Sequence, residues 1–180
     1  MNTDHPILFP DFDPDDVINT EVVHHTKATS ERSVVRRIAL QMLYELDSTE
    51  HQIGSVITTQ LNYHNLSTKA LKQLRTLVIG VRENSSELDN AIQHFAPEWP
   101  LNQVAVIDRN ILRMAIYEFA IWEGTPEKVA IDEAVKLANV FGSDSSPRFI
   151  NGVLGTAVSN RDFLSEKLSL KSDDTPDEEA

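Results

Sequence analysis

The sequence predicts an all-α fold of about seven helices, and three observations support this. Apolar residues recur at spacings of three and four through most of residues 30–160, which is the period of an amphipathic helix. Glycine and proline are scarce there and fall at the edges of these stretches. No segment shows the alternating pattern of a half-buried strand. The chain has 180 residues, enough for a sizeable hydrophobic core.

Both ends of the chain read as acidic, disordered tails. Residues 1–29 contain three prolines and clustered aspartates without helical periodicity, and we interpret them as a disordered N-terminal extension. Residues 161–180 form an acidic C-terminal tail. The net charge of −12 is concentrated in these tails, because residues 31–160 hold fifteen acids and twelve bases. A local basic surface on residues 31–160 therefore remains compatible with the overall charge.

The first half of the domain contains three or four expected helices. Ser30 precedes the first, which has an apolar face, and a shorter helix covers about residues 52–63. Ser67 is placed to cap a longer helix that restarts near Asn84 and runs toward Phe95. The proline-rich stretch "APEWPL" then marks a joint, and predicts two subdomains at about residues 30–96 and 101–160.

The second half contains the most apolar segment. Residues 104–122 are apolar around most of the helix circumference, which predicts a central helix. Thr125-Pro126 and Ser146-Pro147 each look like a cap followed by proline at the first helical position. Gly142 is expected to end the helix between them, and Asp132 is expected to pair with Lys136 on its outer face.

Motifs of catalysis and metal binding are missing from the sequence. It has no G-x-S-x-G, no phosphate-binding glycine loop, no H-E-x-x-H and no Glu-x-x-His, and it has no cysteine. The six histidines are scattered, and we interpret His24-His25 as tail surface. We therefore expect neither an enzyme, nor a metal, nor a cofactor. No apolar run approaches a membrane span and the acidic N-terminus lacks the pattern of a secretory signal, so we expect no membrane association and a cytoplasmic location.

Two features suggest a binding partner. Arg32, Arg36 and Arg37 lie in the first two turns of the first helix, where positive charge opposes the helix dipole. They form either a solvated face or a site for phosphates. The turn after Gly142 places serine hydroxyls, including Ser146, at a helix N-terminus beside Arg148 and Phe149. This arrangement suits single-stranded RNA, although spacing with Val153 equally allows Phe149 to be a core residue.

Three further positions allow more than one interpretation. Arg113 lies in an apolar helix and is expected to form a structural ion pair with Glu118 or with a carboxylate on another helix. Tyr44 fits either the core or a partner-facing surface. Gly152 and Gly155 permit close approach of a neighbouring helix or of a ligand, and we favour the helix.

Three stretches resemble the NusB family of transcription antitermination factors: "RRIALQMLYEL", "ILRMAIYEF" and "KVAIDEAVKLANVFGSDSSPRFINGVLG". The similarity spans about residues 31–160. It implies an all-helical RNA-binding fold that pairs with the ribosomal small-subunit protein NusE. It also implies that this pair binds single-stranded boxA RNA and joins the RNA polymerase antitermination complex, notably on ribosomal RNA operons.

The resemblance also assigns roles to particular residues. It implies RNA contacts by Arg32, Arg36, Arg37, Ser146, Arg148 and Phe149. It places Tyr44 and Asp108 toward the NusE-type protein. The sequence leaves open whether the free protein forms a homodimer.

The chain departs from the family pattern at several points. Ser33, Val34 and Val35 interrupt the arginine arm, Ser145 follows Asp144 where a second acid is usual, and Gly155 ends the "NGVLG" stretch. A thinner arm implies fewer phosphate contacts and a shallower salt dependence. We further expect the acidic tails to compete with RNA for the basic surface.

Two other functions compete with an antitermination factor. The same helical domain occurs fused to ribosomal RNA cytosine methyltransferases, so the chain would then be an RNA-binding or interaction module lacking its catalytic domain. A pure protein-interaction module is the other alternative, and it predicts that Arg36, Arg37 and Arg148 tolerate a change to glutamate.

Overall fold

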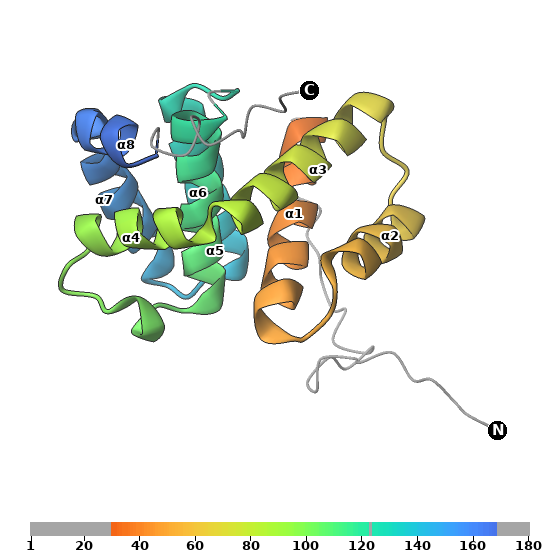
Figure 1. The fold of residues 1–180 in the computed structure, drawn as a ribbon, viewed down its shortest axis with the longest axis horizontal. Helices are drawn as coiled ribbons and strands as arrows, with labels where there is room; N and C mark the ends of the chain where they lie inside the picture. The colour runs from red at the N-terminus through yellow and green to blue at the C-terminus, as the bar shows by residue number, and fades with distance from the viewer. Residues whose placement is uncertain (1–29, 123, 169–180) are drawn as a thin grey trace, which may run out of the picture.

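The computed structural model describes residues 30–122 and 124–168, and this part of the chain is helical without strands (Figure 1). The all-α prediction is confirmed, with one helix more than expected. The helices are α1 (Glu31–Ser48), α2 (Ile53–Tyr63), α3 (Thr68–Glu83), α4 (Ser85–Phe95), α5 (Val106–Ile116), α6 (Glu127–Phe141), α7 (Ser146–Ser159) and α8 (Arg161–Leu168), with a 3₁₀ turn, η1 (Leu101–Gln103), and a π-helical segment, η2 (Tyr117–Ile121).

The helices form two groups joined by α3 and α4, which follow one another across the molecule (Figure 1). Helix α1 packs against both α2 and α3 at one end, and α7 and α8 pack against α4 at the other, with α6 against α7. Helix α4 packs on α5, α7 and α8, which follow the predicted joint in the sequence. The proposed subdomain limits at that joint stay a prediction.

Helix α5 is the central element of the core. It packs against α1, α3, α4, α6 and α7. Ile111, Leu112 and Ile116 are fully buried, in agreement with the apolar circumference of this segment.

Of the three predicted caps, Ser67 is found as expected, and Ser30, which precedes the first helix, also caps its helix. Ser30 accepts a hydrogen bond from the N–H of Ser33, and Ser67 accepts one from Ala70. The other two predictions were wrong in detail. Pro126 is itself the N-cap of α6, and Ser146 is already the first residue of α7. The hydroxyls of Thr125 and Ser146 are drawn away from capping by buried carboxylates, Glu118 and Asp108.

A buried ion pair connects α1 to the π-helical segment. The guanidinium of Arg36 donates from Nη2 to Oε1 of Glu118 at 2.7 Å and from Nε to Oε2 at 2.9 Å. The residues are 3% and 1% exposed. Thr125 donates to the same carboxylate at 3.0 Å, and Glu133 lies 3.5 Å from Nη1 of Arg36. These contacts offset the free energy that is lost when the two charges are removed from water.

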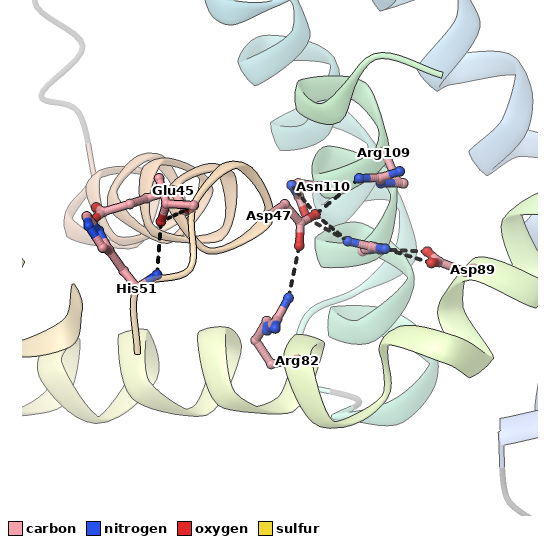
Figure 2. Close-up of polar contacts among 9 residues, drawn as sticks. Glu45, Asp47, His51, Arg82, Asp89, Arg109 and Asn110 are labelled. Carbon is pink, nitrogen blue, oxygen red and sulfur yellow. Dashed lines mark hydrogen bonds and ion pairs between the residues drawn. The ribbon is translucent and has the colours of Figure 1, made fainter. Parts of the chain in front are cut away.

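A second network joins α1, α3, α4 and α5, with Asp47 at its centre (Figure 2). Asp47 accepts hydrogen bonds from Arg82, Arg109, Asn110 and Arg113. Arg113 also makes a two-pronged contact with Asp89, with both distances 2.6 Å. The predicted structural role of Arg113 is confirmed, with carboxylates on other helices as partners instead of Glu118. The predicted Asp132–Lys136 pair is replaced by a contact of Lys136 with Glu133 at 2.6 Å.

Helix α8 was not expected, because residues 161–168 were assigned to the acidic tail. Leu164 is 1% exposed and anchors this helix. The ring of Phe163 stacks on His94 of α4, with centroids 3.8 Å apart. One anchoring leucine in an otherwise polar segment gives a weak periodic signal.

One polar contact sets the start of α7 against α5. The hydroxyl of Ser146, 1% exposed, donates to Oδ2 of Asp108 at 2.8 Å and accepts the N–H of Ser143 at 2.9 Å. Gly142 lies so close that an added Cβ would be 2.5 Å from Cβ of Ser146. A larger residue at position 142 would push the turn away from α7.

We predict that Arg36→Met lowers the free energy of unfolding by about 3–5 kcal/mol, because it leaves Glu118 buried without its cation. Urea unfolding would measure the loss. The matched control is Arg37→Met on the exposed neighbour, for which we expect a change within about 0.5 kcal/mol. Equal losses for the two variants would contradict a special role of the buried pair.

A second prediction concerns pH. Burial raises the pKa of Asp108, and the hydrogen bond from Ser146 opposes only part of this rise. When the pKa of a carboxyl is higher in the folded than in the unfolded state, the free energy of unfolding falls as the pH rises. The fall begins near the unfolded pKa, about 3.9, and ends above the folded value. Asp108→Asn carries no such charge, so its stability relative to the parent should increase between about pH 3 and pH 7. Urea titrations at several pH values test this, and a difference independent of pH would refute it.

Candidate nucleic-acid interface

The arginine-rich start of α1 divides into exposed and buried side chains. Arg32 and Arg37 are exposed and form no ion pair with any other residue in the described ranges. Arg36 is the exception to the predicted set, because Glu118 holds its guanidinium inside the protein. In this fold the guanidinium of Arg36 has a structural role, and its predicted RNA contact stays a prediction.

The turn between α6 and α7 also differs from expectation in one residue. Ser146 was predicted to contact RNA, but its hydroxyl is buried and already bonded to Asp108. Ser143 and Ser145 remain exposed, with their hydroxyls 3.1 Å apart. Ser146 therefore positions the turn, while the neighbouring serines face solvent.

A groove of about 780 Å³ runs between the proline-marked joint and the exposed side of α7. Its walls include Trp99 of the joint and Arg148, Phe149 and Gly152 of α7. The rings of Trp99 and Phe149 are inclined to one another at 59°, with centroids 5.7 Å apart. Trp99 is 58% exposed, and Arg148 is exposed. The groove thus offers an aromatic pair beside the exposed guanidinium of Arg148.

Phe149 combines the two interpretations left open by the sequence. It is half-buried and packs against the hydrophobic core, and it also lines the groove. At the start of α7 the ring of Phe149 therefore lies between the hydrophobic core and the groove. Its contact with RNA stays a prediction.

Asp108 contributes an unsatisfied acceptor at this groove. The residue is 8% exposed and lines the groove, and its Oδ2 is bonded to Ser146. Its Oδ1 has no hydrogen-bond partner among the described residues. Oδ1 is itself buried, and the predicted contact of Asp108 with the NusE-type protein stays a prediction.

Gly152 and Gly155 lie on the exposed side of α7, where an added Cβ would meet no atom within 4 Å. The expectation that they allow close approach of a neighbouring helix was wrong for the described part of the chain. Gly152 instead borders the groove.

Tyr44 is 43% exposed on α1, so it belongs to the surface rather than to the core. Its predicted contact with a protein partner remains untested. His24-His25 and the tails lie outside the described residues.

Trp99 is the groove residue that the sequence analysis missed. An aromatic residue between Pro97 and Pro100, outside any periodic segment, was the available signal. The joint lies outside the helices, so helical periodicity does not predict which way its tryptophan faces.

The described residues show neither a metal-binding cluster nor a membrane-spanning helix. No group of three histidine or acidic side chains there is placed to hold a metal ion. None of the helices in the described ranges combines the length and apolar character needed to cross a membrane.

Comparison with known proteins agrees with this geometry. The NusB family model matches residues 33–159. The transcription antitermination protein NusB of Chloroflexus aggregans is 45% identical over 143 residues, covering 78% of this chain and 94% of the relative. The protein of the same name from Roseiflexus sp. is 48% identical, covering 71% and 92%.

Solved structures show the same fold. T. maritima NusB is 29% identical with a TM-score of 0.64, covering 77% of this chain and 97% of that structure. A NusB chain in a complex of NusB and NusE with double-stranded RNA is 19% identical with a TM-score of 0.64, covering 76% and 96%. The family match spans more than half of this chain, and the resemblance found in its three sequence stretches is confirmed: the chain belongs to the NusB family.

Proposed function

We propose that this chain is a non-enzymatic, RNA-binding transcription antitermination factor. Together with a NusE-type ribosomal small-subunit protein it binds boxA RNA and promotes processive transcription of ribosomal RNA operons. Family membership supports this, as do relatives that carry the name transcription antitermination protein. A NusB chain of the same fold has been solved with NusE and RNA. Acting on nascent transcripts within the RNA polymerase complex places the protein in the cytoplasm.

The groove beside α7 is the observation that carries the proposal. Its aromatic pair, Trp99 and Phe149, presents ring faces for unpaired bases, and stacking of this kind is the usual basis of single-strand binding. Arg148 adds a cation for the phosphate backbone. Together these groups suit a nucleotide better than an apolar ligand.

Arg32 and Arg37 extend the phosphate-binding surface, because they are exposed and unpaired in the described ranges. Arg36 and Ser146 support the site from below. Tyr44 is our candidate contact for the NusE-type protein, since an exposed tyrosine is a common anchor at protein interfaces.

The alternative function is that of an RNA-binding or interaction module that belongs to a ribosomal RNA methyltransferase and lacks the catalytic domain. Relatives of nearly the same length as the matched region favour the stand-alone factor, since this chain covers 94% and 92% of the two relatives named above.

The direct test is a titration of boxA-containing RNA and scrambled RNA with the protein, alone and with the NusE-type partner. We expect preferential binding of boxA RNA that strengthens when the partner is present. Binding that ignores both the RNA sequence and the partner would contradict the proposal.

Phe149→Leu separates stacking from packing, because leucine retains apolar volume but lacks the ring face. We expect RNA affinity to fall by about 1–3 kcal/mol, the usual value of one stacked base. Thermal unfolding serves as the control and should change little. A variant with normal RNA affinity and lower thermal stability would show that Phe149 acts only in the core.

Arg148→Gln should weaken RNA binding and reduce the slope of log K against log salt by about 0.7, as expected for loss of one single-strand phosphate contact. The matched control is Lys167→Gln on α8, which removes the same charge away from the groove. Equal salt slopes for Arg148→Gln and the parent protein would exclude a phosphate contact by Arg148.

A further inference from the structure

A second groove, of about 600 Å³, follows the outer side of α3 and has no role in the proposed RNA contacts. Tyr117 of the π-helical segment forms one wall. An added Cβ at Gly80 would lie 2.0 Å from the hydroxyl oxygen of Tyr117, so the tyrosine can rest against α3 only because residue 80 is glycine. We call this feature the α3 groove.

The chemistry of the α3 groove changes along its length. Thr68 and Leu71 lie at the start of α3, followed by the cations Lys72 and Arg75. Ile79, which is 37% exposed, and Tyr117 provide an apolar part further along, and Glu83 closes the far end. Lys72 and Arg75 are without ion pairs in the part of the chain that the structure describes. The groove is therefore basic near the start of α3 and apolar beyond.

The described chain begins beside the basic end of this groove. Glu31 accepts hydrogen bonds from the N–H of Ser67 at 2.9 Å and from its hydroxyl at 2.8 Å. Thr68, the next residue, lines the groove. Residues that precede Ser30 are therefore tethered next to the start of α3.

The sequence before Ser30 contains a segment of matching chemistry, "PILFPDFDPDD" at residues 6–16. Its acids, at positions 11, 13, 15 and 16, lie nearer to the tether than Ile7, Leu8 and Phe9, and Phe12 stands among the acids. Followed away from the tether, both the groove and the segment pass from charged to apolar, with opposite signs of charge. We propose that residues 6–16 bind the α3 groove of the same molecule, acids against Lys72 and Arg75 and apolar residues against Ile79 and Tyr117.

The length of the intervening chain suits this occupant. A random coil of the length of residues 17–29 spans roughly 20 Å on average, and the described α3 is about 24 Å long. A tether of this size gives an effective concentration in the millimolar range, so even a weak contact is populated. Three prolines limit the unbound conformations of residues 6–16 and lower the entropy lost on binding.

Paramagnetic NMR on the full chain tests the proposal. Because the sequence has no cysteine, His5→Cys supplies a single attachment site for a nitroxide just before the segment. We expect the amide signals of α3 residues near Ile79 to lose most of their intensity relative to the reduced label. The α8 signals should be unchanged.

Two sets of substitutions in the labelled chain test the chemistry. Phe9→Ser with Phe12→Ser, and separately Lys72→Glu with Arg75→Glu, should each restore the α3 signals. Lys167→Glu is the control for a reversed charge elsewhere and should restore nothing. Lys72 and Arg75 are charged side chains that face the groove, so their substitution should leave the core unchanged. Unchanged amide chemical shifts in α5 and α7 would verify this.

Three results would overturn the proposal. One is an absence of signal loss on α3. Another is loss confined to the start of α1, which would place the acids on Arg32 and Arg37 instead. The third is signal loss when spin-labelled protein at natural isotope abundance is mixed with ¹⁵N protein that carries no nitroxide. That result would show that the segment binds a second copy of the chain.

Discussion

The buried ion pair between Arg36 and Glu118 fixes the rotation of α1, and the exposed chemistry of this end of the molecule depends on it. Successive helical residues point about 100° apart, so turning Arg36 inward leaves Arg37 facing solvent. Glu118 belongs to the π-helical segment that continues α5, and Thr125 binds the same carboxylate. One pair of charges thus holds α1, the end of α5 and the approach to α6 together. Burying two charges is favourable only with such complete pairing.

The contact between Ser146 and Asp108 does the same for the groove beside α7. It places the start of α7 against α5, and Gly142 leaves the space that this placement needs. Asp108 is 8% exposed, with Oδ2 bonded to the serine hydroxyl and Oδ1 buried, so it supports the wall of the groove. The residues that shape the groove are therefore distinct from those that face it, Arg148, Phe149 and Trp99.

Intramolecular pairing also determines where this acidic protein is locally basic. Arg36, Arg82, Arg109 and Arg113 are held by carboxylates of neighbouring helices. Within the described residues, cations without an ion pair include Arg32 and Arg37 at the start of α1, Arg148 at the start of α7, and Lys72 and Arg75 on α3. A net charge of −12 is consequently compatible with anion binding, because the field at a groove is set by the charges nearest to it.

The sequence alone determined the helical class, most helix limits, the central position of α5 and the family, because periodicity, caps and motif order are local properties. It also selected Arg148 and Phe149, whose place at a helix start follows from the turn before them. Tertiary structure alone decided between Arg36 and Arg37, since the deciding partner, Glu118, lies 82 residues away. It likewise removed Ser146 from the surface, added Trp99 to the groove and anchored α8 through Leu164. Each of these outcomes depends on contacts between side chains that are far apart in the sequence. The residues next to each position in the sequence carry no signal of such contacts.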